Sequence, residues 1–334
     1  MNPVSTLIVA EAGVNHNGDL GIAQGLIEAA AGAGADLVKF QTFTADRLVG
    51  KQAPLAAYQL ASGESDQFEM IRRLELSRAD HERLIECCRS NGIGFFSTGF
   101  DIESVDLLAE LGQTRFKVAS GEIDNLPLLR HIGSFGCEVI LSTGMAEMTE
   151  IRDALGVLQR AGTARESVTV LHCTTNYPAS FSDVNLSAMQ AIGREFDVAV
   201  GYSDHTLGIE ASVAAVALGA TVIEKHITLD LEFPGPDHQA SLEPNEFVAM
   251  VRSIRNVEVA LGDGRKRPAE SELRNLVVTR RSIVAARRIC MGEVFDESNI
   301  CTKRPGTGLS PMLWDDVVGR RATRDFDIDE MIEL

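Results

Sequence analysis

The sequence predicts an α/β protein in which a (β/α)8 barrel is followed by a small β-rich module. Up to residue 262, short apolar runs rich in Val, Ile and Phe alternate about eight times with Ala-rich amphipathic stretches, as in a parallel sheet that closes into a barrel. Gly, charged residues and Pro then cluster at 262–268, and the remaining chain consists of short segments broken by Gly, Pro and Asp. We expect a barrel at 1–265, a linker at 266–278 and a small domain at 279–334.

Eight strands are predicted in chain order, each from one apolar run. They are expected at 7–12, 37–42, 94–98, 116–120, 139–143, 168–173, 198–202 and 221–224. Helical spacing of apolar residues predicts helices between them, for example at 22–33, 81–90, 104–111, 150–161, 210–218 and 245–261. A doubly wound open sheet is the alternative, but the segment after the first strand, EAGVNHNG, lacks the GxGxxG turn typical of that fold.

Composition excludes several classes of partner. The chain of 334 residues has 31 Lys and Arg against 48 Asp and Glu, a net charge of −17. Because a field of this sign repels phosphodiester backbones and anionic lipids, we expect neither nucleic acid nor a membrane as a partner. The apolar runs are shorter than the roughly 20 residues of a membrane helix, and no signal peptide is visible. The six cysteines show no CxxC pair, so we expect reduced thiols in a cytoplasmic protein.

Polar and ionisable residues lie at the end of every predicted strand. Active sites of (β/α)8 barrels are built at the C-terminal ends of the strands, so we expect one site that gathers these side chains. They are Glu11, Lys39, Gln41, Ser97, Thr98, Lys117, Ser120, Glu122, Ser142, Thr143, His172, Ser203, Asp204, His205, Glu224, Lys225 and His226.

Two lysines, Lys39 and Lys117, lie inside apolar strands, where an unpaired Lys is rare. Each could pair with a carboxylate of the barrel. Alternatively, the two bind a phosphate or carboxylate group of a ligand, and Ser and Thr hydroxyls at neighbouring strand ends complete the anion site. Positive charge that is focused in one cleft lets an acidic protein bind an anion.

His205 and His226 end neighbouring predicted strands, a workable separation for two imidazoles on one metal ion. Neutral imidazoles together with water and substrate oxygens suit a divalent ion such as Mn²⁺, although a histidine in a barrel can also be a hydrogen-bonded core residue. The segment PGPDH at 234–238 predicts a rigid turn that carries the Asp237 carboxylate, and a plain loop explains it equally well.

Nine ordered motifs in the barrel, and one in the tail, match a known pattern. The barrel motifs are AEAGVNHNG (10–18), VKFQTF (38–43), KVASGE (117–122), LSTGM (141–145), LHC (171–173), YP (177–178), GYSDHT (201–206), IEKH (223–226) and PGPDH (234–238). The tail motif is KRPGTG (303–308). Along essentially its whole length the chain resembles the sialic acid synthases and their nonulosonate-forming relatives. The resemblance implies a TIM barrel followed by an antifreeze-like (SAF) domain.

The resemblance also implies a role for individual residues. Glu11 would position or deprotonate a water molecule, with Glu122 as its rival or helper. A homodimer is implied in which the domains are swapped, so that Arg304 of each tail reaches the sugar in the partner's barrel. Phosphoenolpyruvate would bind to Lys39, Thr98, Lys117, Ser120 and Ser203, the sugar to Gln41, Tyr177, Glu224, Asp237 and Arg304, and Mn²⁺ or another divalent cation to His205 and His226.

The reaction implied is the condensation of phosphoenolpyruvate with an N-acetylated amino sugar and water, which releases phosphate by C–O cleavage. We expect N-acetylmannosamine as the sugar and a nine-carbon sialic acid as the product. The alternative is an N,N'-diacetyllegionaminate or pseudaminate synthase acting on a diacetamido-trideoxyhexose. A Schiff-base aldolase using Lys39 or Lys117, and a sugar-binding barrel without activity, are alternatives outside the family. Gly99, Ile227 and Thr307 depart from the family's usual Pro, Phe and Asn.

Overall fold

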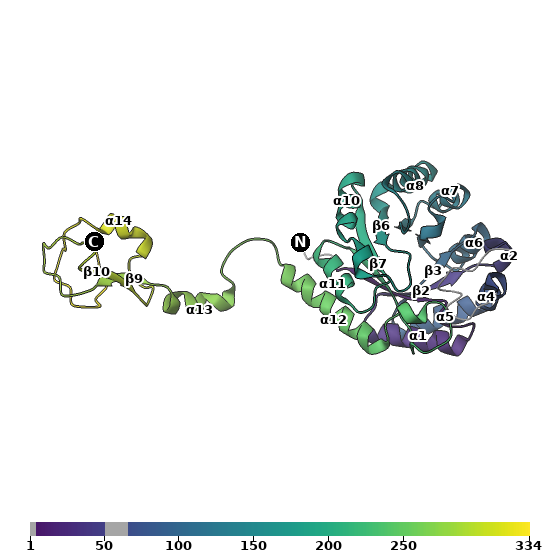
Figure 1. Ribbon diagram of the computed structural model, residues 1–334, viewed down its shortest axis with the longest axis horizontal. Helices are drawn as coiled ribbons and strands as arrows, with labels where there is room; N and C mark the ends of the chain where they lie inside the picture. The colour runs from purple at the N-terminus through teal and green to yellow at the C-terminus, as the bar shows by residue number, and fades with distance from the viewer. Residues whose placement is uncertain (1–4, 51–65) are drawn as a thin grey trace. The chain divides into compact units, whose positions relative to one another are not determined.

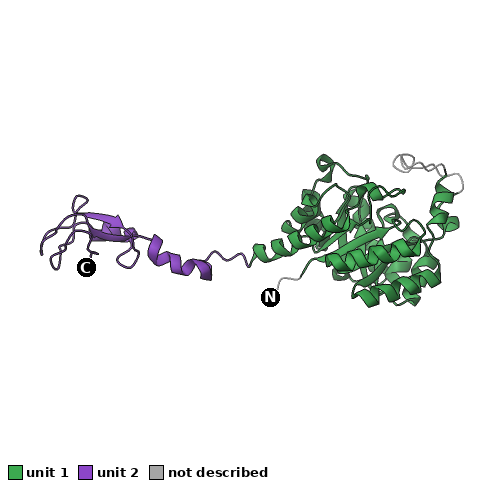
Figure 2. Ribbon diagram, turned by 90° about the horizontal axis from the view of Figure 1, so that it is seen from below, with its two compact units in different colours: residues 1–262 green, residues 263–334 purple. Residues whose placement is uncertain are grey.

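The computed structural model describes residues 5–50 and 66–334 (Figure 1). The chain divides into two compact units, 1–262 and 263–334 (Figure 2). Each unit has an apolar core of its own, so each can be described by itself.

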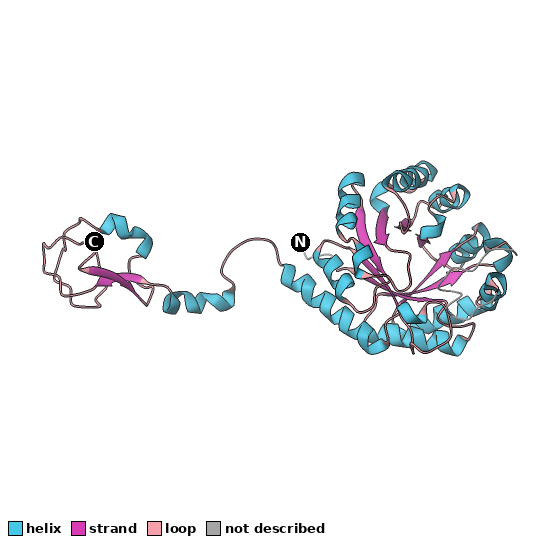
Figure 3. Ribbon diagram, viewed as in Figure 1, coloured by secondary structure: helices cyan, strands magenta, loops and turns pink. Residues whose placement is uncertain are grey.

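The first unit contains one sheet of eight parallel strands, whose hydrogen-bonded order is β3-β2-β1-β8-β7-β6-β5-β4. Its strands are drawn in magenta in Figure 3. The two ends of that order, β3 and β4, lie next to each other, so the barrel is nearly closed. This confirms the predicted fold class. The strands are β1 (Leu7–Gly13), β2 (Leu37–Thr42), β3 (Gly94–Gly99), β4 (Arg115–Val118), β5 (Glu138–Ser142), β6 (Val168–Cys173), β7 (Ala199–Asp204) and β8 (Val222–His226).

Helices cover the outside of the barrel, and the main core lies between them and the strands (Figure 3). The long helices are α1 (Leu20–Ala33), α5 (Arg78–Asn91), α6 (Ile102–Glu110), α7 (Leu126–Ser134), α8 (Met148–Ala161), α10 (Ser187–Phe196), α11 (Glu210–Ala217) and α12 (Pro244–Leu261). Short ones are α2 (Ala45–Leu48), α4 (Gln67–Arg73) and α9 (Phe181–Val184), with 3₁₀ turns η1 (Ser120–Glu122), η2 (Arg165–Ser167) and η3 (His238–Ala240).

Local chemistry sets the helix boundaries. The Asp19 side chain accepts hydrogen bonds from the first N–H groups of α1, and Gly34 ends that helix in the left-handed conformation, which glycine adopts without steric cost. Ser77 and Asp80 form a capping box at the start of α5. The fourth predicted strand, 116–120, is shorter in the structure, because the chain turns into η1 at Ser120.

The second unit is a small module around a two-stranded antiparallel sheet, β9 (Ser282–Ala285) and β10 (Ile300–Lys303). It also contains α13 (Glu270–Thr279), η4 (Pro311–Leu313) and α14 (Trp314–Val317). Its core is formed by nine buried residues, among them Ile283, Phe295 and Phe326. Most of the segment that we expected as a linker, 266–278, is helical, and the Gly306 N–H donates to the Val277 carbonyl at 2.8 Å. Helix α13 is therefore tied to the module that follows it.

Among the described residues, none of the helices combines the length and the apolar character that a membrane span requires.

Candidate active site

A cavity of about 560 Å³ opens at the C-terminal ends of the barrel strands. Twelve of the fourteen site residues expected from the sequence line it. They are Glu11, Lys39, Gln41, Thr98, Lys117, Ser120, Tyr177, Ser203, His205, Glu224, His226 and Asp237. The structure therefore brings together residues that are up to 226 positions apart in the chain.

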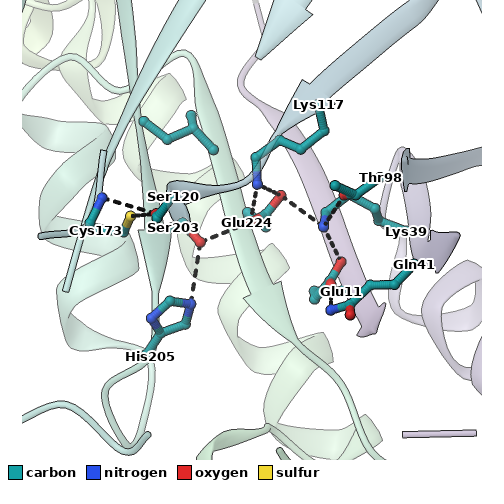
Figure 4. Close-up of polar contacts among 12 residues, drawn as sticks. Glu11, Lys39, Gln41, Thr98, Lys117, Ser120, Cys173, Ser203, His205 and Glu224 are labelled. Atoms are coloured by element: carbon teal, nitrogen blue, oxygen red, sulfur yellow. Dashed lines mark hydrogen bonds and ion pairs between the residues drawn. The ribbon is translucent and has the colours of Figure 1, made fainter. Parts of the chain in front are cut away.

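The centre of the cavity is a buried chain of alternating charges, drawn in Figure 4. Lys39 Nζ lies 2.7 Å from Glu11 Oε2 and 3.6 Å from Glu224 Oε2, and it donates to Thr98 Oγ1 at 3.1 Å. Lys117 Nζ donates to both oxygens of Glu224, at 2.9 and 3.1 Å. Both lysines thus pair with barrel carboxylates, which the sequence had left as one of two possibilities. Glu224, expected to contact the sugar, bridges the two lysines.

Strand register explains why these groups meet. The parallel pairing places Glu11 opposite Lys39 on β2 and opposite His226 on β8. The same pairing sets Ser203 opposite Glu224, and the Ser203 hydroxyl donates to Glu224 Oε1 at 2.9 Å. Glu11 Oε1 accepts a hydrogen bond from Gln41 Nε2 at 3.2 Å. These side chains are therefore positioned by rigid strands rather than by loops.

The four buried charges shift one another's pKa. Burial raises the pKa of Glu11, and the nearby Glu224 carboxylate adds to the effect, while Lys39 opposes it. Burial would also raise the pKa of Glu224, but Lys117 and Lys39 hold it well below its ordinary value. Burial favours the neutral form of Lys39, yet the two carboxylates raise its pKa. Burial lowers the pKa of Lys117. Glu224 is thus the stable anion, and Glu11 is the carboxyl group that is more easily protonated.

His205 and His226 lie with their ring centroids 5.6 Å apart, and Tyr177 packs against His205 at 4.2 Å between centroids. The Nδ1 atom of His205 lies 2.7 Å from the Thr174 carbonyl, which can only accept, so the lone pair of this imidazole is on Nε2. His226 Nδ1 is buried and has no hydrogen-bond partner among the described residues. Burial lowers the pKa of both histidines, which keeps both rings neutral.

These two rings fit a shared metal ion. A metal–nitrogen bond of about 2.1 Å places an ion roughly 3 Å from a ring centroid, so the separation of 5.6 Å suits one ion between them. Within residues 5–50 and 66–334, no group of three or more His, Cys, Asp and Glu side chains is arranged as a metal site. Water or substrate would therefore supply the remaining ligands.

A second buried ion pair supports the two histidines from outside the cavity. Asp204 and Lys225, the neighbours of His205 and His226 in the chain, are fully buried and 3.1 Å apart. Asp204 also accepts hydrogen bonds from the backbone and side chain of Thr206 and from Ser212. This network joins the ends of β7 and β8, so it fixes the positions of the two imidazoles.

Two glycines leave room for the site. A Cβ atom on Gly13 would lie 3.2 Å from Glu11 Oε1 and 3.4 Å from both Gln41 Nε2 and His226 Cε1, and the φ angle of Gly13 is +52°. A Cβ atom on Gly144 would approach within 2.9 Å of Ser120 Oγ, and the Gly144 N–H donates to that oxygen at 2.9 Å. Ser120 is thereby held at the cavity wall.

Two expected site residues do not line the cavity. Glu122 is the last residue of η1, just before α7. Its carboxylate accepts a hydrogen bond from Asn125 Nδ2 at 2.6 Å. Of the two carboxylates expected to act on water, Glu11 thus lines the cavity and Glu122 does not. Arg304 belongs to the second unit, is exposed, and donates from Nε to the Thr279 carbonyl at 3.0 Å. Asp237 does line the cavity, and burial raises its pKa to about 7, with a contribution from Glu11.

Sequence reasoning missed one wall of the cavity. Helices α2 and α4 follow β2 and contribute apolar side chains, including Leu48, Met70 and Ile71. These residues do not end a strand, so the rule that located the polar residues could not find them. The amphipathic pattern of 67–74 was the available signal.

Comparison with known proteins places the chain in a family. A family model described as the NeuB family matches residues 26–266, and a SAF domain model matches residues 280–333. The N,N'-diacetyllegionaminic acid synthase of Campylobacter jejuni is 51% identical over 98% of both chains, and the Legionella pneumophila protein of that name is 48% identical over 95% of this chain and 90% of its own.

A solved structure of a related enzyme is also similar to this chain. The N-acetylneuraminic acid synthetase of Leptospira borgpetersenii, crystallised with citrate, superimposes with a TM-score of 0.71 at 34% identity, covering 81% of this chain and 90% of that one. The family model covers most of the chain, and the relatives match it nearly from end to end. The chain therefore belongs to the NeuB family, the sialic acid synthase family that its motifs resemble.

Proposed function

We propose that this protein is an N,N'-diacetyllegionaminate synthase that condenses phosphoenolpyruvate with a diacetamido-trideoxyhexose and water. The observation that carries the proposal is the 51% identity to the Campylobacter enzyme of that name over 98% of both chains. The N-acetylneuraminic acid synthetase structure is only 34% identical. The similarity thus favours the alternative substrate over the N-acetylmannosamine that we expected from the motifs.

The charge chain supports an anionic substrate. An ammonium group has three donors, and among the described residues Lys117 donates only to Glu224. Donor capacity therefore remains for a phosphate or carboxylate oxygen of phosphoenolpyruvate. The hydroxyls of Ser120 and Ser203 line the same side of the cavity and complete this anion site.

The reaction proceeds in two bond-forming steps. The enol carbon of phosphoenolpyruvate attacks the aldehyde carbon of the open-chain sugar, whose oxygen takes up a proton from Glu11, which is left as a carboxylate. Water then adds to the resulting oxocarbenium carbon, and phosphate leaves with its bridging oxygen as that C–O bond breaks. Glu11 accepts the proton of this water, because its raised pKa suits a general base and Gln41 fixes one of its oxygens. A divalent ion such as Mn²⁺ on His205 and His226 would act as a Lewis acid towards the aldehyde oxygen.

Phosphate release from phosphoenolpyruvate tests the proposal. The sugars to compare are N-acetylmannosamine, its 6-phosphate, and the diacetamido-trideoxyhexoses that lead to legionaminic and pseudaminic acid. We expect the legionaminic precursor to have a kcat/KM at least tenfold above every other sugar. A higher value for N-acetylmannosamine or for the pseudaminic precursor would contradict the assignment.

The position of bond cleavage has a separate test. Phosphoenolpyruvate labelled with ¹⁸O at the bridging position should give labelled phosphate, because the C–O bond breaks. A Schiff-base aldolase would instead be trapped covalently by borohydride and pyruvate. In the structure both candidate lysines are paired with carboxylates, and for Lys39 these carboxylates raise the pKa, which keeps its ammonium group charged and poorly nucleophilic.

A further inference from the structure

A cluster of apolar side chains lines the cavity beside Gln67 of α4, and we call this cluster the apolar wall. Its members form a separate cluster, in which Phe43 and Phe100 make an edge-to-face contact with 6.1 Å between ring centroids. All seven members line the cavity: Val14, Phe43, Leu48, Met70, Ile71, Leu74 and Phe100. No side chain of this wall carries a nitrogen or oxygen atom.

The rest of the cavity near the strand ends is strongly polar. Figure 4 shows Gln41 and Glu11 at one end of the polar contacts and Ser120 and Cys173 at the other. Gln41 and Phe43 are two residues apart at the end of β2, so the polar groups and the apolar wall meet there. A ligand that fills the cavity therefore needs one polar, reactive part and one part without hydrogen-bonding groups.

We infer that the apolar wall binds the deoxygenated end of the sugar and selects a terminal methyl group over a hydroxymethyl or phosphorylated one. The inference rests on the proposed function, because it assumes an amino sugar that reacts at the polar end of the cavity. A methyl group gains by leaving water for an apolar surface. A hydroxyl group in the same place loses its water hydrogen bonds and finds no partner among the seven side chains of the wall. A phosphate group would lose more, since it carries charge.

The expected selectivity is moderate for a hydroxyl group and large for a phosphate group. Apolar pockets reject a ligand that only adds a hydroxyl by up to about 10²-fold in kcat/KM. We therefore expect a ratio of about 10 to 100 between the diacetamido-trideoxyhexose and the same sugar with a terminal hydroxymethyl group. Because the two sugars differ by one oxygen atom, the ratio reports on the site around that atom alone.

Two substitutions add a polar atom to the wall with little change of shape. Met70→Gln and Phe100→Tyr should each lower the kcat/KM ratio of the two sugars at least fivefold, because the added polar group hydrogen-bonds the hydroxyl. Met148→Gln makes the same chemical change at the start of α8, outside the cavity, and should leave the ratio unchanged. A general loss of stability or activity lowers both kcat/KM values together and does not move the ratio.

The outcomes separate this inference from the proposed function. If the wild-type protein converts both sugars with a ratio near one, or if both wall variants keep the wild-type ratio, the wall does not select the methyl group, and the proposed function stands. If neither sugar gives phosphate with phosphoenolpyruvate, the proposed function fails, and the role of the wall fails with it.

Discussion

Glu11 is buried in the cavity beside charged partners, whereas Glu122 lies outside the cavity just before α7. Glu11 is 2% exposed, bonds Gln41, and lies between Lys39 and His226 in the strand register. Glu122 is only partly buried and holds Asn125 at the start of α7. Two carboxylates that the sequence could not rank are thus separated by burial and by their neighbours.

Glu11→Gln should lower kcat by about 10²-fold or more, because the amide cannot accept the proton of the attacking water. Glu122→Gln is the matched control and should keep most of the activity. Steady-state phosphate release, with circular dichroism to check folding, measures both. Equal losses in the two variants would show that the water is activated by neither carboxylate alone.

Asp237 should make the protein less stable as the pH rises. Its pKa is about 7 in the folded chain against an ordinary value of 3.8, so between these values the folded state holds a proton that the unfolded state releases. The stabilising contribution is complete below about pH 4 and is lost as the pH rises through 7. Asn cannot ionise, so Asp237→Asn should not lose this stability. The change in the free energy of unfolding from pH 5 to pH 8 should therefore be about 3 kcal/mol more favourable in the variant than in wild type.

Urea unfolding at the two pH values, with EDTA present, measures this difference. Asp153→Asn, at an exposed position of α8, should leave the pH dependence of wild type unchanged. The same pH dependence in wild type and in Asp237→Asn would mean that Asp237 is ionised throughout this range.

At the scale of elements, the ends of β7 and β8 act as one support for the histidine pair. The buried Asp204–Lys225 ion pair links the two strands directly behind His205 and His226. The sequence placed both charged residues at strand ends but not on the outer side of the barrel. Alternation of side chains along a strand explains the difference, because neighbouring residues point to opposite faces.

His205→Ala and His226→Ala should each abolish Mn²⁺ binding and most activity while the barrel stays folded. Two imidazoles are the only protein ligands that we assign, and an ion held by one of them would exchange rapidly. Calorimetric titration with Mn²⁺ provides a readout independent of turnover. His172→Gln is the control, because His172 bonds the Val184 carbonyl and does not line the cavity. Unchanged Mn²⁺ affinity in either alanine variant would remove that histidine from the site.

The elements that could be predicted from the sequence are those with a clear pattern of apolar residues. All eight strands lie where apolar runs predicted them, and their ends located most of the site. Helices α7 and α10 lie in gaps between predicted strands for which no helix was named among the examples. The pairing of Lys117 with Glu224 lay outside what the sequence could predict, because it depends on the three-dimensional path of β4 and β8.

At the scale of the whole molecule, the chain consists of a catalytic barrel and a small module with its own core. The family resemblance implies that Arg304 of one chain serves the barrel of another, and we propose such a homodimer. In the second unit the Arg304 guanidinium uses Nε for the Thr279 carbonyl, and a guanidinium has five donors. Donors thus remain for a sugar acyl oxygen.

Mixing two inactive variants tests this assembly. Arg304→Ala and Lys117→Ala should each be poorly active, and exchange of subunits should produce hybrid dimers with one intact site. A random mixture should recover about a quarter of wild-type activity, by the statistics of a two-fold dimer. No recovery, with subunit exchange confirmed by light scattering of tagged chains or by mass spectrometry, would mean that Arg304 does not act across the dimer.

The buried charges of Glu11, Lys39, Glu224 and Lys117 should couple the binding of an anion to the uptake of a proton from solvent. Without substrate, each lysine faces a carboxylate, so the site is electrically balanced. A phosphoenolpyruvate molecule that draws the lysines to itself leaves Glu11 with less positive charge nearby, which raises its pKa further and lets it take up a proton, the one that it gives to the aldehyde oxygen before it acts as the base for water. The heat of phosphoenolpyruvate binding should then differ between HEPES and Tris in proportion to their ionisation enthalpies, and the affinity should fall as the pH rises. Equal heats in the two buffers would show that the carboxylates keep their charge when the anion enters.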